Sequence, residues 1–226
     1  TNADFGVISV VDRLHAATNP DAWFYEKPIT IEDHQASRWI IEPVLRLLDC
    51  CQESDGGVAL VVTSAERARD LRQTPAVIRA AVQGAAYDAE TTTAYYRDDL
   101  TGLSDMAVAA ERLWAAADLT PDDIDTAFLY DHFTPLVFLQ LEELGFCGRG
   151  EAKDFATFEN LTLGGRLPIN TNGGLLGEAY IHGMNGITES VRQIRGTAVN
   201  QVPDAEHVLV TAGTGVPTSA LILGRP

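Results

Sequence analysis

Residues 126–145 read TAFLYDHFTPLVFLQLEELG. The apolar run at 126–130 predicts a short strand that ends at Tyr130. Residues 135–145 then predict a helix, which Gly145 stops because glycine readily adopts the left-handed conformation that ends many helices. A strand followed closely by a helix is the unit from which helix-covered sheets are built. Tyr130 and the polar residues after it are therefore expected at the end of a strand.

The rest of the chain continues this alternation. Helices are predicted at residues 3–17, 103–118 and 180–195, and strands at 57–63, 76–85, 208–212 and 219–223. The run GVALVVT at 57–63 is continuously apolar, which is typical of a strand buried on both faces. Thr30 and Ser64 are expected to cap short helices. The expected fold class is α/β, with a mixed five-stranded sheet layered with helices.

Two segments are expected to differ in organisation. Residues 1–55 carry several X-Pro steps and predict a linker region that leads into a domain at 56–226. Within that domain, the helix at 180–195 is expected to be the least exposed one. The reason is a set of small residues that let a helix approach its neighbour closely, namely Ala179, Gly183 and Gly186.

Composition excludes several classes of function. The chain has 226 residues, 46% hydrophobic content and a net charge of −16. A nucleic-acid-binding surface needs clustered lysine and arginine, and an acidic surface disfavours anionic membranes. The chain has three cysteines and five scattered histidines, without a disulfide framework or zinc-ligand spacing. We expect a cytoplasmic, metal-free protein with neither a nucleic-acid nor a membrane partner.

A second informative stretch is NGGLLGEAYIHGMNG at residues 172–186, which carries Tyr180. Taken alone, Tyr130 and Tyr180 would be packing residues, and Asn172-Gly173-Gly174 would be an ordinary turn. Five further stretches matter through their order along the chain: NPDA at 19–22, ITIED at 29–33, PVLRLLDCC at 43–51, SDGGVALV at 54–61 and NTNGG at 170–174.

This order of stretches resembles the C-terminal half of thiolases of the sterol-carrier-protein type. The resemblance implies a layered thiolase-like fold, of which the N-terminal half is absent from this chain. That family usually has His-Asp-Cys-Phe at the first site and Gly-His-Pro at the second. Tyr130 stands in place of the first His, His132 in place of the Cys, and Tyr180 in place of the second His. The framework is kept, whereas the groups needed for thiolysis are replaced.

One thiolase-like branch has this pattern, namely the lipid-transfer-protein aldolases of bacterial steroid side-chain degradation. The resemblance implies retro-aldol cleavage of a steroid-derived β-hydroxyacyl-CoA to a 17-ketosteroid and propionyl-CoA. No cofactor is implied beyond the coenzyme A of the substrate. A small OB-fold partner protein is implied, with the full-length chain as a homodimer within a hetero-complex.

Retro-aldol cleavage needs a base for the hydroxyl proton and donors for the thioester enolate. Tyr180 is the favoured base, with a helix N-terminus to stabilise its anion, and Tyr130 is the favoured donor or returning acid, although the reverse assignment stays open. His132 would stabilise a phenolate, with Asp131 orienting it. Supporting or substrate-binding roles are expected for His182, Asn172, Gly173 and Gly174.

Two alternatives remain open from the sequence. The chain could belong to a non-catalytic subunit that binds acyl-CoA or lipid, or that only forms a scaffold. It could also belong to an ordinary thiolase, which would need a nucleophilic cysteine in the absent half.

Overall fold

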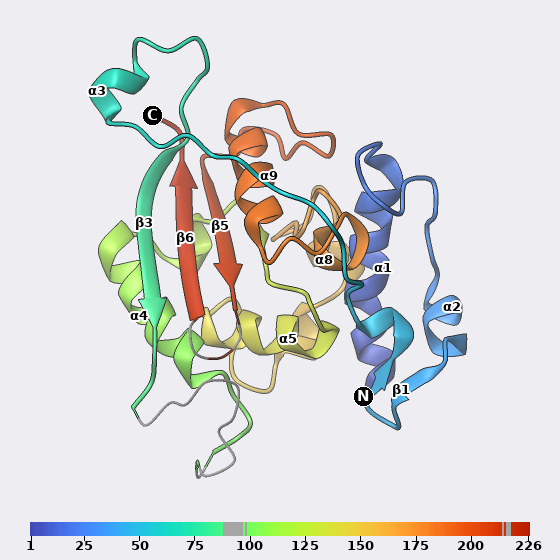
Figure 1. The fold of residues 1–226 in the computed structure, drawn as a ribbon. Coiled ribbons are helices and arrows are strands. Elements are labelled where there is room, and N and C mark those ends of the chain that lie inside the picture. The colour runs from blue at the N-terminus through green and yellow to red at the C-terminus, as the bar shows by residue number, and fades with distance from the viewer. Residues whose placement is uncertain (88–96, 98, 214, 216–217) are drawn as a thin grey trace.

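The computed structural model describes residues 1–87, 97, 99–213, 215 and 218–226, and its centre is a mixed sheet (Figure 1). The sheet contains four strands in the order β3-β6-β5-β4. β4 is parallel to β5, whereas the β5–β6 and β6–β3 pairs are antiparallel. The strands are β3 (Val77–Gly84), β4 (Thr126–Phe128), β5 (His207–Ala212) and β6 (Thr218–Gly224). The α/β class and the mixed pairing expected from the sequence are confirmed.

Helices cover both faces of this sheet. Successive strand residues point to opposite faces, and along β5 Leu209 belongs to one hydrophobic cluster while Val208 and Val210 belong to others. The Leu209 face packs on α4 (Ser104–Ala117), and the opposite face packs on α9 (Met184–Arg195), which lies in front of the sheet in Figure 1. The sheet is therefore a middle layer, as the alternation predicted.

The predicted strand at residues 57–63 is absent from this sheet. The segment runs across the molecule toward α3 (Ala65–Ala68) without a strand assignment, and Val61 and Val62 are 91% and 77% exposed. A continuous apolar run favours a strand only where a neighbouring strand accepts its hydrogen bonds, and the described residues supply none there. The expected five-stranded sheet therefore has four strands in the described part of the chain.

The helix predicted at 180–195 begins later, at Met184, so Tyr180 lies in the turn before it. α9 approaches the sheet closely because Gly186 faces Phe128 of β4, and a Cβ at Gly186 would lie 2.2 Å from the Phe128 ring. Only one side of α9 is buried, however, whereas all residues of α8 (Gly174–Gly177) are buried. The small residues do permit close packing, but α8 is the more completely buried helix.

Residues 1–55 include α1 (Asn2–Thr18) and α2 (Ile31–Ala36) and pack beside the rest of the chain. α1 packs against α8 and α5 (Thr134–Glu143), and its Ile8 and Val11 enter the largest hydrophobic cluster. Asp49 joins this layer to α5 by accepting from the Thr134 hydroxyl at 2.7 Å. The caps expected at Thr30 and Ser64 are present.

The remaining elements are short. They are α2 (Ile31–Ala36), β1 (Trp39–Ile41), β2 (Leu45–Arg46), η1 (Leu47–Asp49), η2 (Pro121–Asp123), α6 (Ala152–Phe155) and α7 (Phe158–Leu161). Among the described residues, no helix combines the length and apolar character that crossing a bilayer requires.

Candidate active site

Tyr130 follows β4 directly, and its backbone is fixed from two sides. Its N–H donates to Thr211 Oγ1 of β5 at 2.9 Å, and its carbonyl accepts from Gln140 Nε2 of α5 at 2.9 Å. Its ring packs in a small cluster with Phe128, Leu175 and other apolar residues, and the residue is 6% exposed. The strand-end position expected for Tyr130 is therefore a rigid one.

Tyr180 approaches from the other side of the site, in the turn between α8 and α9. It forms a bridge with Glu53, and its N–H donates to Ser54 Oγ at 3.2 Å. These contacts come from the segment that precedes the exposed run at 57–63. Because Tyr180 lies before the first residue of α9, it does not occupy the helix start that was expected to stabilise its anion.

The two tyrosines converge. Their hydroxyl oxygens are 3.0 Å apart, which is a hydrogen bond in which either oxygen can be the donor. The rings meet edge to face, with 6.3 Å between centroids. Burial, followed by the hydroxyl of Tyr180, raises the pKa of Tyr130 well above its ordinary value. Tyr130 is therefore a neutral phenol that can donate a proton or a hydrogen bond.

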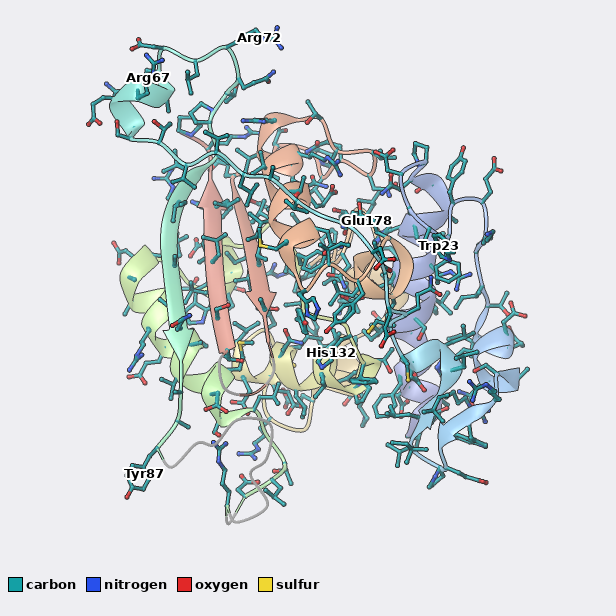
Figure 2. All side chains as sticks on the ribbon, viewed as in Figure 1. Trp23, Arg67, Arg72, Tyr87, His132 and Glu178 are labelled. Carbon is teal, nitrogen blue, oxygen red and sulfur yellow. The ribbon has the colours of Figure 1, made fainter. Side chains whose placement is uncertain are left out.

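One histidine accompanies each tyrosine. The His132 ring lies 4.7 Å from that of Tyr130, and the His182 ring lies 4.5 Å from that of Tyr180 (centroid distances). Burial lowers the pKa of His132 to about 4, so its imidazole is neutral near pH 7. A neutral ring stabilises a phenolate by donating a hydrogen bond rather than by positive charge. Figure 2 shows His132 near the centre of the molecule, between the sheet and α1.

The carboxylate of Asp131 is hydrogen-bonded to the start of α8. Its two carboxylate oxygens accept from the backbone N–H groups of Leu175 and Leu176, each at 2.9 Å. These bonds turn the carboxylate toward the first turn of α8. The residue between Tyr130 and His132 thus anchors the helix that leads to Tyr180.

The loop residues assigned to substrate binding are buried in this structure. Asn172 accepts from the Gly174 N–H at 3.2 Å and donates to Glu178. Gly173 has a φ of 111°, and a Cβ there would lie 2.6 Å from Ala16 of α1. Gly174 is equally enclosed, since its Cβ would meet the Asp131 carboxylate. Asn172, Gly173 and Gly174 therefore shape the loop, and their polar groups serve the fold.

Glu178 is a residue that sequence reasoning missed. Its carboxylate accepts from Asn172 and from Asn185 Nδ2, the latter at 2.9 Å, and Arg192 lies 3.9 Å away. Burial raises the pKa of Glu178 to about 7. The contacts tie the Tyr180 loop to α9, and Figure 2 places Glu178 beside α8. A single acidic residue in the glycine-rich stretch at 172–180 was the available signal.

The cysteines show no sign of nucleophilic activation. Cys51 packs in the cluster of Tyr130 and Tyr180, but burial raises the pKa of its thiol to about 12. Burial also raises the pKa of Cys50, and it raises that of Cys147 to about 11. All three are free and partly buried. A thiolate is the reactive form of cysteine, so these thiols are poorly suited to accept an acyl group.

Comparison with known families accounts for this arrangement. A family described as "Thiolase C-terminal domain-like" matches residues 84–225, which is more than half of the chain. The chain belongs to the thiolase C-terminal-domain-like family. The resemblance drawn from the sequence is thereby confirmed, and the tyrosine pair occupies the thiolase-like framework described above.

The named relatives of this thiolase-like chain include a lyase and an aldolase. It is 68% identical over 224 residues to the 17-hydroxy-3-oxo-4-pregnene-20-carboxyl-CoA lyase of Mycobacterium tuberculosis, covering 99% of this chain and 58% of the relative. It is 66% identical over 224 residues to the steroid side-chain-cleaving aldolase of Thermomonospora curvata, covering 99% of this chain and 57% of the relative. A solved structure described as "Ltp2-ChsH2(DUF35) aldolase" matches with a TM-score of 0.97 at 66% identity, covering 100% of this chain and 59% of that one. The chain thus spans somewhat more than half the length of these relatives.

Proposed function

We propose that the protein containing this chain is a carbon–carbon lyase that cleaves a steroid-derived β-hydroxyacyl-CoA by a retro-aldol reaction. The products are a 17-ketosteroid and propionyl-CoA. The observation that supports the proposal is the 3.0 Å contact between the hydroxyls of Tyr130 and Tyr180. The name of the Mycobacterium tuberculosis relative supports the same substrate class.

The tyrosine pair can supply the proton transfers of this reaction. Tyr180 reacts as a phenolate that accepts the hydrogen bond of the neutral Tyr130 hydroxyl, and it takes the proton of the substrate hydroxyl. The bond between the α and β carbons then breaks, and the electron pair of that bond forms the thioester enolate. Tyr130, held neutral by its raised pKa, stabilises the enolate oxygen and then protonates the enolate carbon. The hydrogen bond between the hydroxyls returns the proton from Tyr180 to Tyr130, so the site ends in its starting state.

Thiolysis is disfavoured by the same residues. An acyl transfer needs an activated nucleophile, and the thiol beside the tyrosine pair, Cys51, has a pKa raised to about 12. Retro-aldol cleavage forms no covalent intermediate with the enzyme, so it tolerates the absence of a thiolate.

The assembly is part of the proposal. The description of a solved relative as "Ltp2-ChsH2(DUF35) aldolase" supports a hetero-complex. We propose that the full-length chain forms a homodimer in that complex and that the partner is a small OB-fold protein. Coenzyme A enters as part of the substrate. Three free cysteines suit a reducing compartment, which supports a cytoplasmic enzyme.

Product analysis tests the function. The full-length chain with its partner is incubated with 17-hydroxy-3-oxo-4-pregnene-20-carboxyl-CoA, and propionyl-CoA and the ketosteroid are quantified by chromatography. Equal molar release of both products is expected. Intact thioester after incubation would favour the acyl-CoA- or lipid-binding subunit. An acyl-transfer product that appears only with free coenzyme A would favour a thiolase.

A further inference from the structure

Two buried carboxyl groups lie between α1 and the segment that follows Tyr130. Asp12 of α1 and Asp131 are both 0% exposed, and their carboxyl groups lie around the side-chain amide of Asn170. Asn170 Nδ2 is 3.4 Å from Asp12 Oδ2, and a Cβ at Gly174 would lie 2.9 Å from the same nitrogen and 2.3 Å from Asp131 Oδ2. Each carboxyl group also shifts the pKa of the other. Asp131 already accepts from Leu175 and Leu176 with its two oxygens. A hydrogen bond between two carboxyl groups requires a proton on one of them. One of the two aspartates must therefore be protonated if their carboxyl groups are hydrogen-bonded.

The hydrogen bonds identify Asp12 as the protonated partner. Asp131 is well supplied with donors, since two backbone N–H groups point at it. Asp12 Oδ2 has a single long contact, 3.4 Å from Asn170 Nδ2, and Oδ1 has no donor within reach among the described residues. A buried carboxylate oxygen without a donor is costly, whereas a protonated oxygen there donates to Asp131. One proton on Asp12 satisfies both groups.

The charges around the pair do not remove the need for this proton. On α1, the Arg13 guanidinium donates to a backbone carbonyl and lies over an aromatic ring, and burial lowers the pKa of His15 to about 4. Tyr130 and Cys51, which face Asp131 from their own segments, have raised pKa values and are neutral. α8 carries no titratable side chain, and the Glu178 carboxylate after it is engaged by two asparagines. Two ionised carboxylates would therefore repel each other.

We propose that Asp12 and Asp131 share one proton and that this acid pair positions Tyr130 and Tyr180 at hydrogen-bonding distance. Asp131 is adjacent to Tyr130 in sequence, and it anchors α8, which ends at Gly177 just before the turn of Tyr180. Asp12 holds this unit against α1. The effect of the acid pair on turnover rests on the proposed function. The shared proton does not depend on that function.

The packing between α1 and α8 makes the spacing sensitive to this pair. A Cβ at Gly177 would lie 2.7 Å from Ala16 Cβ and 3.0 Å from the Asp12 carbonyl oxygen. Such close contact leaves little room for the helices to adjust if the two carboxylates repel. Tyr130 is fixed by β5 and α5, so a shift of α8 moves Tyr180 away from it.

The pair has a defined pH dependence. Burial raises the pKa of Asp131 to about 6 and that of Asp12 well above its ordinary value, whereas an unfolded aspartate titrates near about 3.9. The folded protein thus keeps a proton that the unfolded chain releases. The contribution of the pair to stability is complete below pH ~4 and is lost as pH rises through the folded pKa. Turnover is expected to fall over the same rise in pH, because the second carboxyl group of the pair then ionises.

Two substitutions of Asp12 separate the proton from the packing. Asp12→Asn supplies a permanent donor to Asp131 and cannot ionise, whereas Asp12→Ala removes the donor. In the full-length complex, we expect Asp12→Asn to keep kcat near pH 7 within about threefold of wild type and to lose the alkaline fall assigned to the pair. Asp12→Ala is expected to lower kcat by about 10² with little change in KM, the scale of a small misplacement of catalytic groups.

Infrared spectroscopy tests the proton without relying on activity. The difference spectrum between wild type and Asp12→Asn should contain the carbonyl stretch of a protonated carboxylic acid near pH 7. Glu189→Gln is the matched control, because Glu189 is a buried carboxyl on α9 that is bonded to Thr171 and Gln193 rather than to the acid pair. In this control variant, kcat should still decrease at alkaline pH as it does in the wild type.

The outcomes distinguish the two proposals. A missing protonated-carboxyl band overturns the shared proton, and identical pH profiles for wild type, Asp12→Asn and Asp12→Ala overturn the positioning role. If the wild-type complex releases no propionyl-CoA, the proposed function fails, while the infrared difference still decides whether the proton is shared.

Discussion

Replacing Tyr130 by phenylalanine removes one oxygen from the centre of the proposed site. That oxygen lies 3.0 Å from the Tyr180 hydroxyl. The ring itself keeps its contacts, because it packs 4.7 Å from His132 and lies 3.3 Å from where a Cβ at Gly183 would stand. Tyr130→Phe therefore changes the chemistry of the pair while it keeps the shape of the site.

The expected effects on folding and on turnover differ in size. A hydrogen bond between neutral groups contributes about 0.5–1.5 kcal/mol to stability, which is small beside the ~5–15 kcal/mol of a typical domain. A donor to the enolate, by contrast, contributes about 10²–10³ in kcat, or ~2.7–4 kcal/mol. A catalytic Tyr130 should therefore lose far more in kcat than in the free energy of unfolding.

The assay is propionyl-CoA release by the full-length complex under single-turnover conditions, with denaturant unfolding measured in parallel. Tyr87→Phe is the matched control, because Tyr87 is 97% exposed and lies far from His132 in Figure 2. Its kcat and stability should equal those of wild type. If Tyr130→Phe turns over within about threefold of wild type, the reasoning is refuted, because the hydroxyl would then contribute less than ~0.7 kcal/mol to the barrier.

Three further predictions address packing, acid stability and the thiol. Gly186→Ala should lower the free energy of unfolding by about 1–3 kcal/mol in a denaturation assay, because its Cβ would lie 2.2 Å from the aromatic ring of Phe128 on β4. In the control Gly57→Ala, the new Cβ has no atom within 4 Å, so the free energy of unfolding should change by less than about 0.5 kcal/mol. Burial lowers the pKa of His15 and His132 from 6.5 to about 4, so the unfolded chain binds more protons in that window and stability should fall as pH drops from 6.5 to 4. Replacing either histidine by glutamine should reduce that slope by up to ~1.4 kcal/mol per pH unit, and an unchanged slope would contradict the buried neutral ring. Cys51→Ser should keep propionyl-CoA release within about tenfold of wild type, since its thiol has a pKa near 12 and takes no part in the proposed steps; complete loss would argue for covalent catalysis.

Local sequence signals located most of the sheet. The strands at 76–85, 208–212 and 219–223 were predicted close to β3, β5 and β6, because apolar runs between turn residues report burial directly. The run at 57–63 carries the same signal but lacks a neighbouring strand in the described structure. Strand formation depends on a partner strand that is often distant in sequence, so composition alone could not reveal the difference.

The sequence predicted the positions of some site residues better than those of others. The family resemblance placed Tyr130 and Tyr180 in one pocket, and their hydroxyls do meet. Local patterns could not tell that Tyr180 precedes α9, because the boundary depends on the left-handed turn at Gly183. The contact between Asp12 and Asp131 was beyond prediction, since no periodicity links a residue on α1 with one after β4.

The exposed run at 57–63 has a consequence for handling the chain. Its sequence, GVALVVT, combines β-branched residues, no charge and no proline, and Val61 is 91% exposed. Such a segment, already extended and without ladder partners in the described structure, is a template for intermolecular strand pairing. Concentrated preparations of these 226 residues alone should therefore be prone to aggregate through this run. A lysine introduced at Val61 would oppose that association by charge repulsion between copies.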